Sequence, residues 1–242
     1  MKRLLLPALL LAASFAGAAD AAAPAAPAAP ATPETPLLMI GDSMMRLLGV
    51  AMEKQFKKAG VQPATAFSSL GSGLVRPGAF DWNAKIDELC GANHPKTVFV
   101  AIGTNDRQTL EGGENGPIRY GTPEWEPEYA ARTAAFMDRI LTNGVDRVVW
   151  LLLPAMKEPA NNEHAQLVNR IATEAAQAEV RRDHVTLFDL GPVLSRHPGQ
   201  FAPYIMSATG EALAVRDPDG VHLTNDGAKL VARSILKTFW NK

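Results

Sequence analysis

The sequence predicts a three-layer α/β/α domain with a mostly parallel sheet of five strands. Five short apolar segments, each bounded by Gly, Pro, Asp or Asn, alternate with longer segments in which apolar residues recur every three or four positions. This alternation implies right-handed crossovers, which place helices on both faces of the sheet. The predicted strands are Leu37 to Ile40, Thr65 to Ser69, Thr97 to Ile102, Arg147 to Leu153 and Val185 to Leu190.

Four helices are predicted between and after these strands. In the first, Met45, Leu48, Met52 and Phe56 share one face, and Gly60 ends the segment. The other three have the same spacing, so each should bury one face against the sheet. They are marked by Tyr129, Phe136, Met137, Ile140 and Leu141, by His164, Leu167, Val168, Ile171 and Ala175, and by Leu230, Val231, Ile235 and Phe239.

The first residues have the layout of a secretory signal. Lys2 and Arg3 precede an apolar run over residues 4–15 and a triplet of small residues, 16–18. The run is shorter than the roughly 20 residues that a transmembrane helix needs, so we expect cleavage near Ala18. Residues 19–36 read as an Ala/Pro-rich linker and residues 37–242 as one domain. The expected location is periplasmic or secreted, with no stable membrane insertion after cleavage.

The net charge and the cysteine content exclude several classes of function and of structural site. The net charge is −1, so the chain has no basic field for nucleic acid or anionic lipid. The single cysteine, Cys90, forbids an internal disulfide and a cysteine-based zinc site. We interpret Cys90 as a buried apolar residue on a short helix. A small-molecule or carbohydrate substrate is compatible with this composition.

Gly41-Asp42-Ser43 closes the first predicted strand and opens the first helix. Ser43 can therefore be a nucleophile or the N-cap of that helix, and the two roles are compatible. The helix N-terminus would also bring backbone N–H groups and positive dipole toward a developing oxyanion. Because working groups in such sheets follow the carboxyl ends of strands, this turn belongs on the functional edge.

Two other segments offer oxyanion donors. Gly103-Thr104-Asn105-Asp106 follows the third predicted strand and is either a simple polar turn or the source of a side-chain donor, Asn105. A further donor could be the backbone N–H of Gly73, where glycine lets the chain approach a ligand closely. Gly71 is the competing choice, and spacing does not separate the two.

Asp219-Gly220-Val221-His222 precedes the last helix. His222 would take the proton of Ser43, and Asp219 would orient the imidazole, with Asp217 as a rival acid. The alternative is a metal cluster of Asp217, Asp219, His222 and Asp226. All four lie in one short segment and no distant ligand is signalled, which argues against a metal.

In this order, the four blocks resemble the SGNH/GDSL hydrolase superfamily, over Leu37 to Trp240. The resemblance implies a flavodoxin-like fold, with Ser43 as nucleophile and Asp219 and His222 completing the triad. It also implies an oxyanion hole from the N–H groups of Ser43 and Gly73 and the side chain of Asn105, and no metal or cofactor. The second block departs from the family because it lacks the frequent Asn before the glycine. Met44-Met45 and the run over residues 217–224 resemble a secreted bacterial branch of esterases and acyltransferases.

Two long predicted loops, Arg107 to Glu126 and Gly191 to Pro218, are expected to set specificity. Taken with export, the resemblance predicts a serine esterase acting on O-acyl, chiefly O-acetyl, esters of envelope or extracellular carbohydrate. The alternatives are an O-acyltransferase on the same substrates and a non-catalytic glycan-binding module. Candidate substrate-binding residues are Asp42, Arg76, Trp125 and Tyr204, although Arg76, Trp125 and Tyr204 are equally compatible with a structural role.

Overall fold

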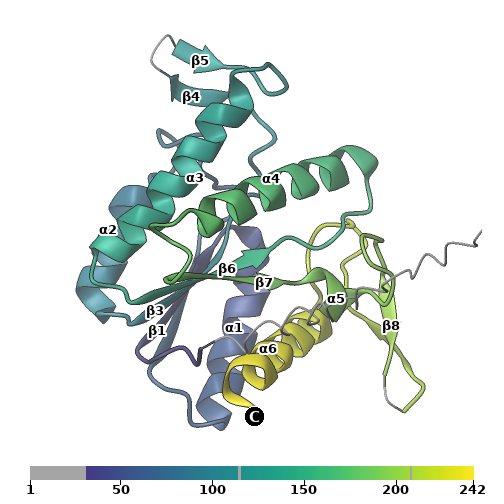
Figure 1. Ribbon diagram of the computed structural model, residues 1–242. Helices are drawn as coiled ribbons and strands as arrows, with labels where there is room; N and C mark the ends of the chain where they lie inside the picture. Colours follow the sequence, from purple (N-terminus) through teal and green to yellow (C-terminus); the bar gives the residue numbers. More distant parts are fainter. Residues whose placement is uncertain (1–30, 114–115, 208) are drawn as a thin grey trace, which may run out of the picture.

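The computed structural model describes residues 31–113, 116–207 and 209–242 (Figure 1). The predicted signal segment 1–18 and linker residues 19–30 lie outside the described residues. The central sheet is parallel throughout, in the order β2-β1-β3-β6-β7, which is a doubly wound order. The predicted α/β/α architecture and all five strands are confirmed. The strands are β1 (Leu37–Gly41), β2 (Ala64–Ser68), β3 (Thr97–Ala101), β6 (Arg147–Leu152) and β7 (Val185–Asp189).

Helices cover both faces of this sheet (Figure 1). α1 (Ser43–Lys58) and α6 (Asn225–Trp240) pack together on one face. On the other face lie α2 (Trp82–Asn93), α3 (Trp125–Thr142) and α4 (Pro159–Gln177). The central strands β1 and β3 are buried at every residue, which explains why the sequence shows continuous apolar runs there.

The two predicted specificity loops are not irregular throughout, because both contain regular secondary structure. The first contains β4 (Leu110–Gly113) and the antiparallel β5 (Gly116–Ile118). The second contains the short helix α5 (Gly191–Leu194) and a hairpin of β8 (Tyr204–Met206) and β9 (Ala212–Ala214). Strands of three or four residues are too short to show a clear alternation of apolar and polar residues, so the pattern could not reveal them.

Two further sequence expectations are settled by local structure. Asp42, and not Ser43, is the N-cap of α1, because its side chain accepts from the N–H of Met44 at 2.8 Å. Cys90 is buried in α2 as expected, and burial, together with the nearby charge of Asp87, raises the pKa of its thiol to about 11. No helix within the described ranges has the length and apolarity needed to cross a bilayer.

Candidate active site

The carboxyl edge of the sheet brings Ser43, His222 and Asp219 into one hydrogen-bonded chain. Ser43 is the first residue of α1, directly after β1, and the Asp219 to His222 turn precedes α6, which packs on α1. Nε2 of His222 lies 2.7 Å from Oγ of Ser43, and its Nδ1 lies 2.5 Å from Oδ2 of Asp219. A carboxylate only accepts, so Nδ1 carries the proton and Nε2 is left to accept from the serine hydroxyl.

The turn that carries Asp219 and His222 is fixed by hydrogen bonds to its own backbone. Oδ1 of Asp219 accepts from the N–H groups of Val221 at 2.8 Å and His222 at 3.0 Å. Burial alone would raise the pKa of Asp219, but the hydrogen bonds from His222 and these N–H groups lower it to about 2. Gly220 has φ of +77°, and a Cβ there would lie 2.2 Å from Cβ of Lys157, so only glycine fits.

Three candidate oxyanion donors follow the carboxyl ends of β1, β2 and β3, which are neighbours in the sheet. The N–H groups of Ser43 and Gly73 donate to no other group within the described residues. Nδ2 of Asn105 donates to the carbonyl of Ser72 at 2.9 Å, which holds the Asn105 amide beside Gly73 and leaves its second N–H unused. Unpaired N–H groups at a helix N-terminus and in a glycine turn suit an oxyanion.

Asp106 fixes the turn that contains Gly73. Its fully buried carboxylate accepts from the N–H groups of Leu74 at 3.1 Å and Val75 at 3.4 Å and from the hydroxyl of Tyr129 at 2.8 Å. Burial raises the pKa of Asp106 against these hydrogen bonds. A Cβ on Gly73 would lie 1.7 Å from Oδ1 of Asp106, so this position requires glycine on packing grounds, whereas a Cβ on Gly71 would meet no heavy atom within 4 Å.

Asp42 is not a substrate-binding residue. Its side chain is 0% exposed, and its carboxylate accepts from the N–H of Met44 at 2.8 Å and of Thr104 at 3.0 Å. It therefore ties the nucleophile turn to the loop that carries Asn105. Burial raises the pKa of Asp42 to about 7, against those two hydrogen bonds, with a further increase from the charge of Asp106.

Trp125 is also not a substrate-binding residue, because it is 1% exposed at the start of α3. Its ring stacks on Tyr129 with centroids 4.7 Å apart, and its Nε1 donates to the carbonyl of Gln108 at 2.8 Å. Tyr204, by contrast, is 60% exposed on β8. An aromatic residue in the sequence could equally be core or surface, so its burial was not predictable from residue type alone.

A cavity of about 270 Å³ lies beside two of the candidate oxyanion donors. Gly73 and Asn105 form part of its wall, together with Arg76, Phe80 and Gln108. Arg76 is exposed and lies within reach of a ligand held there. The structure therefore leaves Arg76 available for substrate, in contrast to Asp42 and Trp125.

Arg216, which no sequence motif indicates, holds the turn that carries Asp219 and His222. Arg216 is 4% exposed, and its guanidinium donates to the carbonyls of Val221 at 2.9 Å, Gly220 at 3.3 Å and Ala155 at 2.6 Å. Burial lowers its pKa to about 10, partly offset by the charge of Asp219. The only signal in the sequence is one arginine three residues before Asp219, directly after an apolar stretch.

The metal alternative finds no support in the position of its fourth member. Oδ1 of Asp226 pairs with Nζ of Lys229 at 2.9 Å on the exposed side of α6. Within the described residues, no group of three or more His, Cys, Asp and Glu side chains is placed to hold a metal ion.

Two solved structures share this fold. A member of the lipolytic protein G-D-S-L family from Veillonella parvula DSM 2008 is 13% identical, with a TM-score of 0.54, and the match covers 85% of this chain and 98% of that one. The lipase Lip_vut3 from a goat rumen metagenome is 12% identical, with a TM-score of 0.51 and coverage of 84% and 96%. The fold implied by the SGNH/GDSL resemblance is confirmed.

Comparison with curated proteins finds no match. One family model, described as Protein of unknown function (DUF459), matches residues 36–238 and so includes every site residue described above. The chain belongs to the DUF459 family, and it carries the fold of G-D-S-L lipolytic proteins.

Proposed function

We propose that the protein is a serine esterase of the SGNH/GDSL type that hydrolyses O-acyl, chiefly O-acetyl, esters of carbohydrate in the cell envelope or outside the cell. The observation that carries the proposal is the continuous chain from Asp219 through His222 to Ser43, with links of 2.5 and 2.7 Å. A nucleophile, a base and an orienting acid in hydrogen-bond contact are what acyl transfer requires.

In the proposed reaction, the Ser43 hydroxyl gives its proton to Nε2 of His222 while Oγ attacks the ester carbonyl carbon. The tetrahedral oxyanion accepts hydrogen bonds from the N–H groups of Ser43 and Gly73 and from Nδ2 of Asn105. Collapse breaks the bond to the alcohol oxygen, which takes the proton from His222. Water then attacks the acyl-enzyme with the same base, and the acid and free Ser43 are released.

Hydrolysis is favoured over transfer by the openness of the site. The side chains of His222 and Asp219 are 33% and 44% exposed, so water reaches the base directly. An O-acyltransferase must keep water away from the acyl-enzyme while a sugar hydroxyl enters. A purely binding module does not need an aligned Ser, His and Asp, so the glycan-binding alternative leaves that geometry unexplained.

The carbohydrate substrate is proposed from the expected export of the chain and from the polar cavity that contains Arg76. Residues 1–18 are proposed as the cleaved signal, which would place the domain in the periplasm or outside the cell. The structural neighbours are named as lipolytic, and this supports ester chemistry as the reaction class.

The test is acetate release from p-nitrophenyl acetate and from a panel of O-acetylated polysaccharides, with labelling by a serine-directed fluorophosphonate. The expected result is turnover of both substrate types and labelling at Ser43, with neither in Ser43→Ala. Addition of EDTA should leave the rates unchanged. Transfer of the acetyl group to an added sugar in place of water would favour the acyltransferase, and absence of turnover and labelling would favour the binding module.

A further inference from the structure

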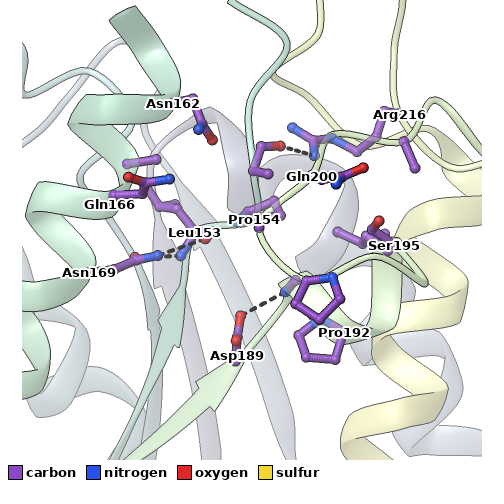
Figure 2. A pocket seen from close by; sticks show the side chains of 17 residues that line it. Leu153, Pro154, Asn162, Gln166, Asn169, Asp189, Pro192, Ser195, Gln200 and Arg216 are labelled. Carbon is purple, nitrogen blue, oxygen red and sulfur yellow. Dashed lines mark hydrogen bonds between the residues drawn. The ribbon is translucent and has the colours of Figure 1, made fainter. Parts of the chain in front are cut away.

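We propose that a second cavity, at the carboxyl ends of β6 and β7, is a binding subsite for a neutral sugar residue of the substrate chain. The cavity holds about 150 Å³ (Figure 2). Given about 30 Å³ for each water in the liquid, this is the space of about five waters, which suits one ring-sized group. The inference rests on the proposed function, because it names where the rest of an esterified glycan is held.

Carboxamide side chains on two sides of this cavity are available to a ligand. Figure 2 shows Asn162 and Gln166 of α4 on one side and Gln200 on the other. Within the described residues, neither glutamine makes a side-chain hydrogen bond, and Asn162 uses only its Oδ1, which accepts from the N–H of Met156 at 3.0 Å. A carboxamide both donates and accepts, so it is complementary to sugar hydroxyls, which do the same.

The remaining polar groups favour a neutral ligand. Oδ1 of Asp189 accepts from the N–H of Gly191 at 2.7 Å, and its other oxygen is left for a hydroxyl donor. On the opposite side lies the buried guanidinium of Arg216, which donates to the carbonyls of Ala155 and Val221 and places a positive charge at the cavity wall. The negative carboxylate of Asp189 and the positive guanidinium of Arg216 both line the cavity. The cavity therefore has no strong preference for a ligand of either charge. Leu153, Pro154 and Pro192 supply apolar surface for the C–H groups of a sugar ring.

The cavity lies beside the proposed catalytic site but does not contain it. Strands in a sheet are about 4.8 Å apart, so the ends of β6 and β7 lie roughly 10 to 15 Å from β1, which precedes Ser43. Arg216 links the two regions, because it donates to Ala155 in the cavity wall and to Val221 in the catalytic turn. This separation fits a ligand whose acylated residue lies at Ser43 while a neighbouring residue of the same chain occupies the cavity.

The test is direct binding to the full chain carrying Ser43→Ala, which removes turnover. Cellotetraose, xylotetraose, chitotetraose and tetragalacturonate are titrated by calorimetry, and we expect at least one neutral tetrasaccharide to bind. Adding both Gln166→Ala and Gln200→Ala to the Ser43→Ala chain should weaken that binding about tenfold, because each lost hydrogen bond costs about 0.5 to 1.5 kcal/mol. Gln177→Ala, an exposed glutamine at the end of the same helix, is the matched control and should bind as the parent does.

Two results would overturn the subsite. Either no neutral tetrasaccharide binds, whether or not tetragalacturonate does, or the glutamine variant binds as tightly as the parent. Hydrolysis of p-nitrophenyl acetate by the chain with Ser43 intact is measured separately. Turnover without tetrasaccharide binding would reject the subsite and keep the esterase. Binding that depends on both glutamines, in a chain without turnover, would keep the subsite and reject the esterase.

Discussion

Replacement of Gly73 by alanine should severely disable the proposed oxyanion site. The new Cβ would lie 1.7 Å from Oδ1 and 2.6 Å from Cγ of Asp106. Asp106 cannot move aside easily, because it is fully buried and held by Leu74, Val75 and Tyr129. We therefore expect the strain to displace the turn that carries the Gly73 N–H.

The size of the effect follows from the contact distance. Ordinary contact begins at 3.4 Å, so a gap of about 1.7 Å must open. Since a displacement of about 1 Å can cost about 10² in rate, kcat/KM should fall by about 10² to 10³. Weakened hydrogen bonds to the Asp106 carboxylate should also lower the free energy of unfolding by about 2 to 4 kcal/mol.

The assay is kcat/KM for p-nitrophenyl acetate, measured well below the thermal midpoint of each variant. Gly71→Ala is the matched control, because it meets no heavy atom within 4 Å and its φ of +71° costs only about 1 to 2 kcal/mol of stability. Its activity should stay close to that of the parent. A fully active Gly73→Ala protein would refute this reasoning, and a larger loss in Gly71→Ala would move the donor role to Gly71.

Four further results are expected. Ser43→Ala should lower kcat by at least about 10⁴ without a large change in thermal stability, because Asp42 provides the helix cap. Asn105→Ala should lower kcat by about 10² to 10³ on every ester, since the oxyanion is common to all of them. Arg216→Lys should lower kcat about tenfold or more at unchanged KM for a small aryl ester, because an ammonium cannot hold the three carbonyl groups that the guanidinium holds. The free energy of unfolding should fall less between pH 6.5 and pH 4 in His164→Gln than in the parent, because burial lowers the pKa of His164 from 6.5 to about 4.

The sign of the His164 effect is fixed by its lowered pKa. Its stabilising contribution is fully present above pH 6.5 and is lost as the pH falls toward 4, because only the unfolded chain takes up the proton in that window. Chemical denaturation at several pH values measures it, and equal slopes in parent and variant would contradict it. Recovery of the kcat of an Arg216→Ala protein by added free guanidinium would support a positioning role for Arg216. A rise in KM without a fall in kcat in Arg216→Lys would contradict that role. An active Ser43→Ala protein, or an Asn105→Ala loss confined to one ester, would contradict the proposed mechanism.

The sequence was sufficient to predict the sheet and the juxtaposition of its loops. Buried parallel strands need unbroken apolar runs, and polar residues directly after them must meet at one edge, which is how Ser43 and Asn105 come together. Trp125 and Asp42 were misassigned because a residue type does not reveal its own burial. Arg216 was missed because its partners are carbonyl groups, which leave no mark on the sequence.

The pairing of α1 with α6 makes the proposed catalytic site depend on a helix far from Ser43 in the sequence. Ser43 and His222 are separated by 179 positions, and they meet only where α6 packs along α1, with Phe56 and Trp240 in ring contact at 5.4 Å. Cleavage after Thr224 would leave all three triad residues in the polypeptide but remove the helix that holds the final turn in place. Proteolysis at that single position would therefore abolish the proposed esterase activity, and a nascent chain would acquire that activity only after α6 had been synthesised and docked.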